Sequence, residues 1–155
     1  MDENQQKIHD LIDGIRFAML TTLDGDRLVS RPMTPLRIEH DLTVLFITQR
    51  HTDVAAQADG HRVNLGFSDG GTFVSLSGTA QLRDDAELKK QLWGPATDAF
   101  TDGGPENPDN VVLAVSADSA SYWDSAPTPV FVWEVIKGAV TGDKPAGGDH
   151  GTVEV

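Results

Sequence analysis

The chain contains no cysteine among its 155 residues. It therefore cannot build a disulfide framework, use a thiolate nucleophile or hold zinc through cysteine ligands. Long apolar runs are also missing, because no segment approaches the roughly 20 apolar residues of a membrane-spanning helix. No basic stretch followed by an apolar one opens the sequence. These absences predict a cytoplasmic protein with no membrane partner.

Basic residues are scarce. Lysine and arginine number 12 against 24 aspartates and glutamates, which gives a formal net charge of −12 and a pI near 4.5. Such a charge repels polyanions at long range, so we expect no nucleic-acid partner. Any phosphate that the protein binds must be held by local donors. A chain of 155 residues suits one domain, and we expect residues 1–155 to form it.

The motifs of several enzyme classes are absent as well. The sequence has no Gly-x-Gly-x-x-Gly fingerprint, no Gly-Lys-Ser/Thr phosphate loop and no Gly-x-Ser-x-Gly elbow. Its five histidines show no ligand spacing such as His-x-x-x-His, so we expect no metal site. No residue is indicated as a separate general acid or base, and the catalytic residues stay unknown.

What the sequence does contain is a series of short strand patterns. The stretch 17–33 predicts a β-hairpin, because Asp24-Gly25 supplies the positive φ of a tight turn between two runs of strand formers. Pro32 cannot donate to a central ladder, so it indicates an edge, a bulge or a strand end. Further strands are predicted over 42–47, 62–68, 72–82, 111–115 resuming at 120–123, and 152–155.

Helices are expected around these strands. Helical spacing or a capping residue predicts three of them, over 4–14, between Thr52 and Gly60, and over 86–93. Over 129–140, strand propensity and helical spacing disagree, and we favour a helix there. A surface loop is expected over 101–110 and a loose tail over 142–151.

The fold class follows from the way these elements alternate. About six short strands joined by hairpins, with helices at the periphery, predict a mainly β (α+β) fold, either a six-stranded antiparallel barrel or a sandwich. The clearest strand is 72–82, in which Val74, Leu76 and Ala80 alternate with mostly polar residues. One face of the sheet is therefore expected to be buried and the other polar.

Several short strings, taken together and in order, resemble those of the pyridoxamine 5′-phosphate oxidase-like split-barrel flavoproteins, and within them the general stress protein 26 group. They are Ala18-Met19-Leu20-Thr21-Thr22, Ser30-Arg31-Pro32-Met33, Phe46-Ile47-Thr48, Arg62-Val63-Asn64-Leu65, Val74-Ser75-Leu76-Ser77-Gly78, Leu92-Trp93 and Tyr122-Trp123-Asp124. The resemblance implies a six-stranded split β-barrel that pairs as a homodimer and holds FMN, or FAD, between its subunits. Trp93, Trp123 and Trp133 are then expected as core or interface anchors.

The resemblance also implies which residues bind the flavin. Arg31 would meet the phosphate, Met33 would lie against the isoalloxazine ring, and Ile47 and Thr48 would line the ring and the ribityl chain. Thr52 would cap the phosphate from a helix N-terminus, whose N–H groups and dipole favour an anion. Without the resemblance, Arg31 is most simply a surface ion-pair partner and Met33 a core side chain.

One departure from the family pattern affects the phosphate. Many relatives carry a lysine just after the capping residue, where this chain has Asp53-Val54. An acidic neighbour thus stands where a cation is expected, and Arg50 and His51 in the same turn are the candidates to replace that cation. Losing one charge-assisted hydrogen bond, worth roughly 1.5–3 kcal/mol, would lower phosphate affinity about ten- to hundredfold.

For function, the resemblance implies a flavin-dependent oxidoreductase that passes electrons between NADH or NADPH and an unidentified acceptor, with the chemistry carried by the flavin. The alternative is a non-catalytic flavin-binding or flavin-sequestering stress-response protein. Oxidation of pyridoxamine phosphate is disfavoured, because the sequence ends without the basic and aromatic C-terminal segment that those oxidases use for their substrate.

Overall fold

The computed structural model describes residues 2–125 and 149–155. Eight strands lie within these residues: β1 (Ala18–Asp24), β2 (Arg27–Met33), β3 (Arg37–Ile38), β4 (Thr43–Gln49), β5 (Arg62–Asp69), β6 (Thr72–Arg83), β7 (Asn110–Asp124) and β8 (Asp149–Glu154). The helices there are α1 (Glu3–Ile12), α2 (Asp53–Ala58), α3 (Ala86–Leu92) and α4 (Pro95–Phe100). The helix predicted over 129–140 lies outside the described residues.

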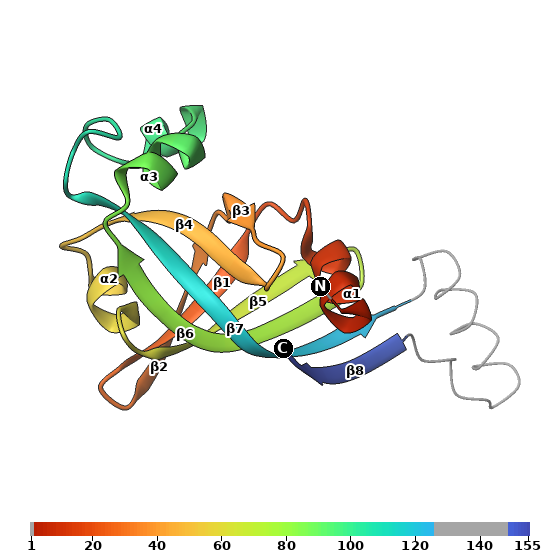
Figure 1. Ribbon diagram of the computed structural model, residues 1–155. Coiled ribbons are helices and arrows are strands. Elements are labelled where there is room, and N and C mark those ends of the chain that lie inside the picture. The colour runs from red at the N-terminus through yellow and green to blue at the C-terminus, as the bar shows by residue number, and fades with distance from the viewer. Residues whose placement is uncertain (1, 126–148) are drawn as a thin grey trace, which may run out of the picture.

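The strands form one antiparallel sheet in the order β2-β1-β5-β6-β7-β4-β3, with β8 added alongside β7. Figure 1 shows β4 and β7 in front of β1 and β5, so the sheet curls around the core, while the helices stand at its periphery. The mainly β split-barrel fold is thus confirmed. The described strands exceed the predicted six, because the two-residue β3 was not expected and β8 adds an edge.

The β1–β2 hairpin is confirmed, with a small shift of its turn. Asp24 pairs with Arg27, so the two-residue loop is Gly25-Asp26 rather than Asp24-Gly25. Gly25 carries the positive φ, at 65°. Pro32 lies on β2, which is the last strand on its side of the sheet, so the missing N–H removes no bond from a central ladder.

The main core fills the inside of the curled sheet and is closed at one end by α1. It is built from alternate strand residues and from the apolar stripe of α1, and includes Ile8, Ile12, Leu20, Phe46, Leu65, Phe67, Leu76 and Leu113. A smaller cluster of Leu45, Leu92, Val112 and Ala114 packs on the other face of β4 and β7, beneath α3. Both faces of β4 are therefore covered, as its continuous apolar run predicts.

Strand β7 differs from the prediction of two separate pieces. It runs unbroken over 15 residues and accommodates its partner β6 through a register shift at Ser77/Gly78. A residue in a strand interior that carries no side chain is typical of a bulge or a close backbone approach. Residues 116–119, read from sequence as an interruption, are thus the bulged part of one strand.

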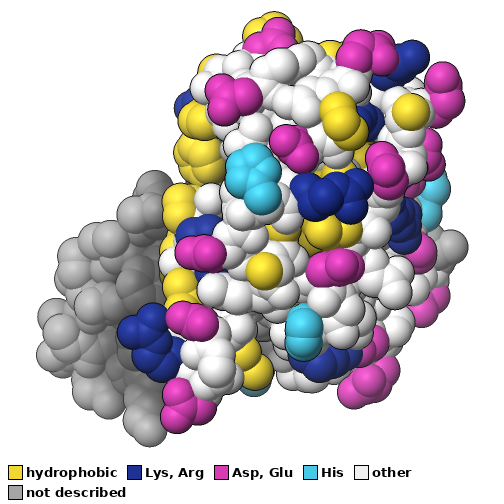
Figure 2. Space-filling model, turned by 90° about the vertical axis from the view of Figure 1, so that its left-hand side faces the viewer, with side chains coloured by type: hydrophobic (Ala, Val, Ile, Leu, Met, Phe, Trp, Pro, Cys, Tyr) yellow, Lys and Arg dark blue, Asp and Glu magenta, His cyan; other side chains and the backbone are white. Residues whose placement is uncertain are grey.

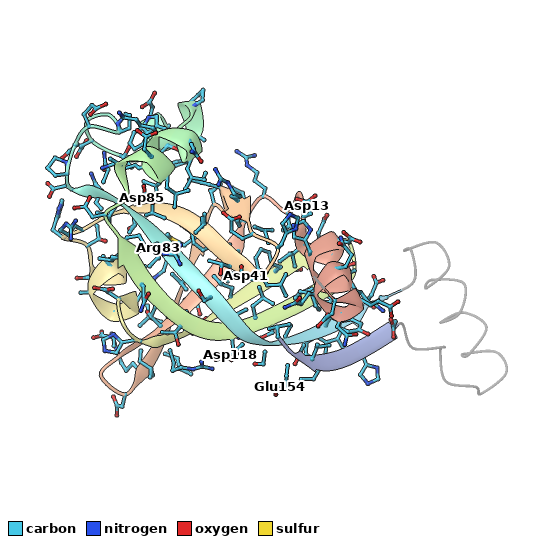
Figure 3. The ribbon with its side chains drawn as sticks, in the orientation of Figure 1. Asp13, Asp41, Arg83, Asp85, Asp118 and Glu154 are labelled. Carbon is cyan, nitrogen blue, oxygen red and sulfur yellow. The ribbon has the colours of Figure 1, made fainter. Side chains whose placement is uncertain are left out.

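Thr52 and Asp85 cap their helices as predicted, whereas the cap of α1 was not predicted. Asp2 forms a capping box with Gln5 at α1, Thr52 caps α2 and Asp85 caps α3, where Figure 3 labels it. Pro95 occupies the first turn of α4, so it restarts a helix instead of ending one. None of the helices in the described part of the chain has the length and apolarity to cross a membrane.

Several predicted boundaries need correction. The helix predicted over 4–14 is Glu3–Ile12, and β7 begins at Asn110, the last residue of the loop predicted over 101–110. The strand predicted from residue 42 begins at Thr43, because Leu42 adopts a left-handed backbone with φ of 62° that ends the preceding turn. The loose tail predicted over 142–151 is wrong for its last three residues, since Asp149 to Gly151 pair with β7, and residues 142–148 lie outside the described residues. The edge strand predicted over 152–155 is confirmed as part of β8.

Candidate functional site

A cavity of about 350 Å³ opens beside the ends of β2 and β4 and is covered by α4. Its apolar lining comes from Phe17, Pro32, Met33, Leu36, Ile47, Ala96 and Phe100. Its polar lining comes from Thr34, Thr48, Gln49, Thr52, Thr97 and Thr101. The volume falls in the range of roughly 300–1,000 Å³ that is typical of small-molecule sites.

The structure brings four of the predicted site residues together. Met33 from β2, Ile47 and Thr48 from β4, and Thr52 at the cap of α2 all line this one cavity. They come from segments up to 19 positions apart in the sequence, so their convergence is a property of the fold. Phe17, just before β1, adds a half-exposed aromatic ring at the same place.

Arg31 lies next to the cavity wall without being part of its lining. Its guanidinium donates to Thr22 Oγ1 at 2.6 Å and to Gln57 Oε1 at 2.8 Å, and so joins β2 to α2. Burial lowers the pKa of Arg31 from its ordinary value, and the Asp53 carboxylate partly opposes that shift. The side chain stays charged, since a guanidinium does not deprotonate in proteins. Arg31 is therefore a partly desolvated cation that is held against α2 by Gln57.

Arg50 does not join this group. It is exposed, its guanidinium pairs with Asp84 at 3.4 Å, and its backbone N–H donates to the Asp109 carbonyl. His51, the other candidate for the missing cation, is exposed as well and lies 3.9 Å from an Asp109 carboxylate oxygen. Both side chains thus already have acidic neighbours on the outside of the turn.

The α2 N-terminus is built as the sequence predicts. Thr52 Oγ1 accepts from the Ala55 N–H at 3.4 Å and donates to the Gln49 carbonyl at 2.7 Å. Asp53 follows it with an exposed side chain that is close enough to affect Arg31 electrostatically. The departure from the family pattern therefore places an acidic group beside the cation expected to hold the phosphate.

Sequence reasoning missed the contribution of α4. Ala96, Thr97 and Phe100 project from this helix into the cavity lining, and Phe100 is 78% exposed. The available signal was the Gly94-Pro95 start of a second short helix, but neither periodicity nor spacing says over which part of the barrel such a helix folds. The loop after α4 is held by buried Asn110, whose side-chain amide donates to the Asp102 and Gly104 carbonyls.

Charges on the side of the molecule that carries α2 and α3 are mixed. Figure 2, which views the molecule from the left of Figure 1, shows acidic side chains scattered over this face with basic ones between them. No side chain that lines the cavity in the described part of the chain is ionisable. An anionic ligand would therefore be attracted by single groups such as Arg31 and not by an extended basic field.

Comparison with known proteins agrees with this architecture. The family described as "Pyridoxamine 5′-phosphate oxidase like" matches residues 3–146. The chain is 33% identical to protein bli-3 of Neurospora crassa, over 91% of this chain and 76% of that protein.

Two solved structures share the fold over most of their length. One, assigned as a general stress protein 26 from Jannaschia sp. CCS1, is 26% identical with a TM-score of 0.80, and each chain is covered in full. The other, the general stress FMN/FAD binding protein of Xanthomonas citri, is 30% identical with a TM-score of 0.69, over 83% of this chain and 93% of that one. The chain therefore belongs to the pyridoxamine 5′-phosphate oxidase-like family, and it is similar to the family's general stress proteins.

Proposed function

We propose that the protein binds a flavin, FMN or FAD, in the cavity between β2, β4 and α4. The observation that carries this proposal is the convergence of Met33, Ile47, Thr48 and Thr52 on one cavity of about 350 Å³. The Xanthomonas citri relative, described as an FMN/FAD binding protein, supports the same ligand class.

The residues present fit such a ligand. Met33, Ile47 and Leu36 offer apolar surface to a flat ring, and aliphatic and thioether side chains pack well against aromatic systems. Arg31 provides a partly buried positive charge that Thr22 and Gln57 hold in place, and a phosphate would accept charge-assisted hydrogen bonds from it. Thr52 and the first turn of α2 would orient the same group.

A bound flavin supplies hydride and electron transfer, so the leading function is oxidation of NADH or NADPH with electrons passed to an acceptor. This chain's own residues would anchor the phosphate, place the ring and exclude water from it. The second candidate is a non-catalytic flavin-binding protein that sequesters the ligand. No ionisable side chain belongs to the described lining, so the flavin itself would carry the chemistry in the first candidate, and turnover is what separates the two.

The deciding experiment starts with the purified protein incubated with FMN, then desalted and examined by visible absorption. A retained and shifted flavin spectrum near one FMN per subunit supports the proposal, and a colourless protein contradicts it. NADH or NADPH oxidation faster than with free FMN would identify the oxidoreductase. Tight binding without such turnover would identify the sequestering protein.

Arg31→Ala tests the phosphate anchor. We expect it to weaken FMN binding about ten- to hundredfold, because a charge-assisted hydrogen bond is worth roughly 1.5–3 kcal/mol, while riboflavin, which has no phosphate, is affected much less. Arg27→Ala is the matched control. Arg27 is an exposed arginine on the same strand, and its guanidinium pairs with Asp24. Equal FMN dissociation constants for the parent and Arg31→Ala in a fluorescence titration would rule out this assignment.

We also propose that the protein is a homodimer. On the outer face of the sheet Phe73 and Trp123 are cross-strand partners, each 49% exposed, and Met19 on the same face is 45% exposed. Large apolar side chains gathered on one surface are typical of an interface. Trp123 thus fits an interface anchor and not a core residue.

Sedimentation velocity tests the homodimer, with a single species of twice the 16.7 kDa chain mass expected. Trp123→Asp should shift that species towards the monomer. A parent protein that sediments as a monomer at micromolar concentration would contradict the proposal.

A further inference from the structure

One buried hydroxyl beside the cavity has no hydrogen-bond partner among the residues that the structure describes. Thr97, on α4, is 7% exposed and lines the cavity. Across residues 2–125 and 149–155, its Oγ1 is the buried side-chain polar atom that makes no hydrogen bond. Buried polar atoms are satisfied in the great majority of cases, and an exception commonly has a functional reason.

The usual explanation for a threonine on a helix does not apply to this hydroxyl. A helical threonine can donate to the carbonyl four residues before it, and Thr101 does so, with its Oγ1 2.7 Å from the Thr97 carbonyl oxygen. Thr97 makes no such bond, and it shares the cavity lining with the apolar side chains of Phe100 and Leu36. The unsatisfied hydroxyl therefore belongs to a residue that lines the cavity, where a bound ligand could supply the missing partner.

We infer that Thr97 is a specificity-determining residue that hydrogen-bonds the polar edge of the flavin ring; this inference rests on the proposed flavin site. The amide and carbonyl groups along that edge of an isoalloxazine need both donors and acceptors, and a hydroxyl supplies either. The phosphate end is assigned elsewhere, to Arg31 and Thr52 at α2. Figure 1 shows α4 and α2 on opposite sides of the end of β4.

Two substitutions separate this role from a structural one. Thr97→Val keeps the shape and removes the hydroxyl, so we expect about two- to tenfold weaker flavin binding, the range of one net hydrogen bond. The same change removes an unsatisfied buried group, so the ligand-free protein should melt at a higher temperature. Thr97→Ser retains the hydroxyl and should return both values towards those of the parent.

The measurement is a fluorescence titration of each variant with FMN and with riboflavin, together with thermal melts of the ligand-free proteins. An equal loss of affinity for both ligands, combined with the higher melting temperature, supports the ring-edge contact. Unchanged affinity in Thr97→Val overturns the inference while leaving the flavin site intact. A loss for FMN alone also overturns it, because the hydroxyl would then meet the phosphate. A parent protein that binds neither ligand overturns both the inference and the proposed function.

Discussion

At position 53 a single side chain would tune the proposed flavin site. Arg31 is held towards α2 by Thr22 and Gln57, so its location does not depend on a bound ligand. Asp53, one turn before Gln57, is near enough to oppose the fall in the pKa of Arg31. A phosphate approaching Arg31 therefore competes with a carboxylate that belongs to the protein.

Asp53→Asn should strengthen FMN binding. Removing this negative charge eliminates repulsion of the phosphate, and the effect of an exposed, solvent-screened charge is about two- to fivefold in the dissociation constant. Riboflavin affinity should stay unchanged, which separates the charge effect from a change in the ring site. A fluorescence titration at low salt measures both.

Asp26→Asn is the control for this charge effect. It removes the same charge from the exposed turn of the β1–β2 hairpin, so it reports the contribution of net charge alone. An Asp53→Asn variant that binds FMN no more tightly than Asp26→Asn would show that position 53 does not influence the phosphate.

At this scale the sequence identified the residues of β2, β4 and the α2 cap that meet at the cavity, because their local motifs carried the resemblance. It could not identify Thr97 or Phe100, since their role depends on where α4 folds over the barrel. Nor could it place Arg50 outside the cavity lining, because its neighbours Asp84 and Asp109 come close only in the folded chain.

At the scale of the elements, the close pairing of β6 with β7 requires a glycine at position 78. A side chain at Gly78 would collide with the Ser116 carbonyl oxygen, and its Cβ would lie 2.8 Å from the Ala117 Cα. These contacts are with backbone of the neighbouring strand, so neither side can rotate away. The close approach coincides with the register shift that lets β7 continue past the bulge.

Gly78→Ala should therefore destabilise the fold by about 1–3 kcal/mol, the usual cost of overpacking a site that cannot relax. Chemical denaturation followed by tryptophan fluorescence measures the change. Gly66→Ala is the matched control, since it lies on neighbouring β5 and a Cβ there would meet nothing nearer than 3.9 Å. Equal stability of the two variants would mean that the backbone shifts to accommodate the methyl group.

The elements also show the limit of reading periodicity. Alternation predicted β6 and its buried face correctly, because Val74, Leu76 and Ala80 are all buried. The same argument predicted two separate strands in place of β7, because the short side chains of residues 116–119, three of them polar, resemble a turn. Pairing with β6, which only the fold establishes, keeps them in the strand.

At the scale of the whole molecule, an ion pair joins α1 to β8, the first and last elements that the structure describes. Lys7 on α1 bonds to Asp149 on β8, and its amine also sits 4.5 Å from the Tyr122 ring centre. The bond to Lys7 is the main reason that the pKa of Asp149 is lowered from its ordinary value. Hairpin patterns predicted the antiparallel barrel, but a contact between residues this far apart leaves no local signal in the sequence.

Because of this ion pair, we expect the stability of the fold to depend on pH in the acid range. A carboxyl whose pKa is lower in the folded than in the unfolded chain stabilises the fold above its unfolded pKa, about 3.9, and the contribution disappears as the pH falls through the folded value. Asp149→Asn should therefore lower the melting temperature slightly at pH 7, and the difference from the parent should vanish near pH 2. The effect is small because both groups are exposed.

Thermal melts of the parent and Asp149→Asn across that range measure the effect, and high salt should reduce the difference at pH 7 because exposed charges are screened. Asp26→Asn serves here too, because it removes an exposed carboxylate from the hairpin turn, and the parent's pH profile should be preserved. A difference for Asp149→Asn that persists unchanged at pH 2 would trace its effect to lost packing against Tyr122. The ion pair would then have no part in holding the two ends of the chain together.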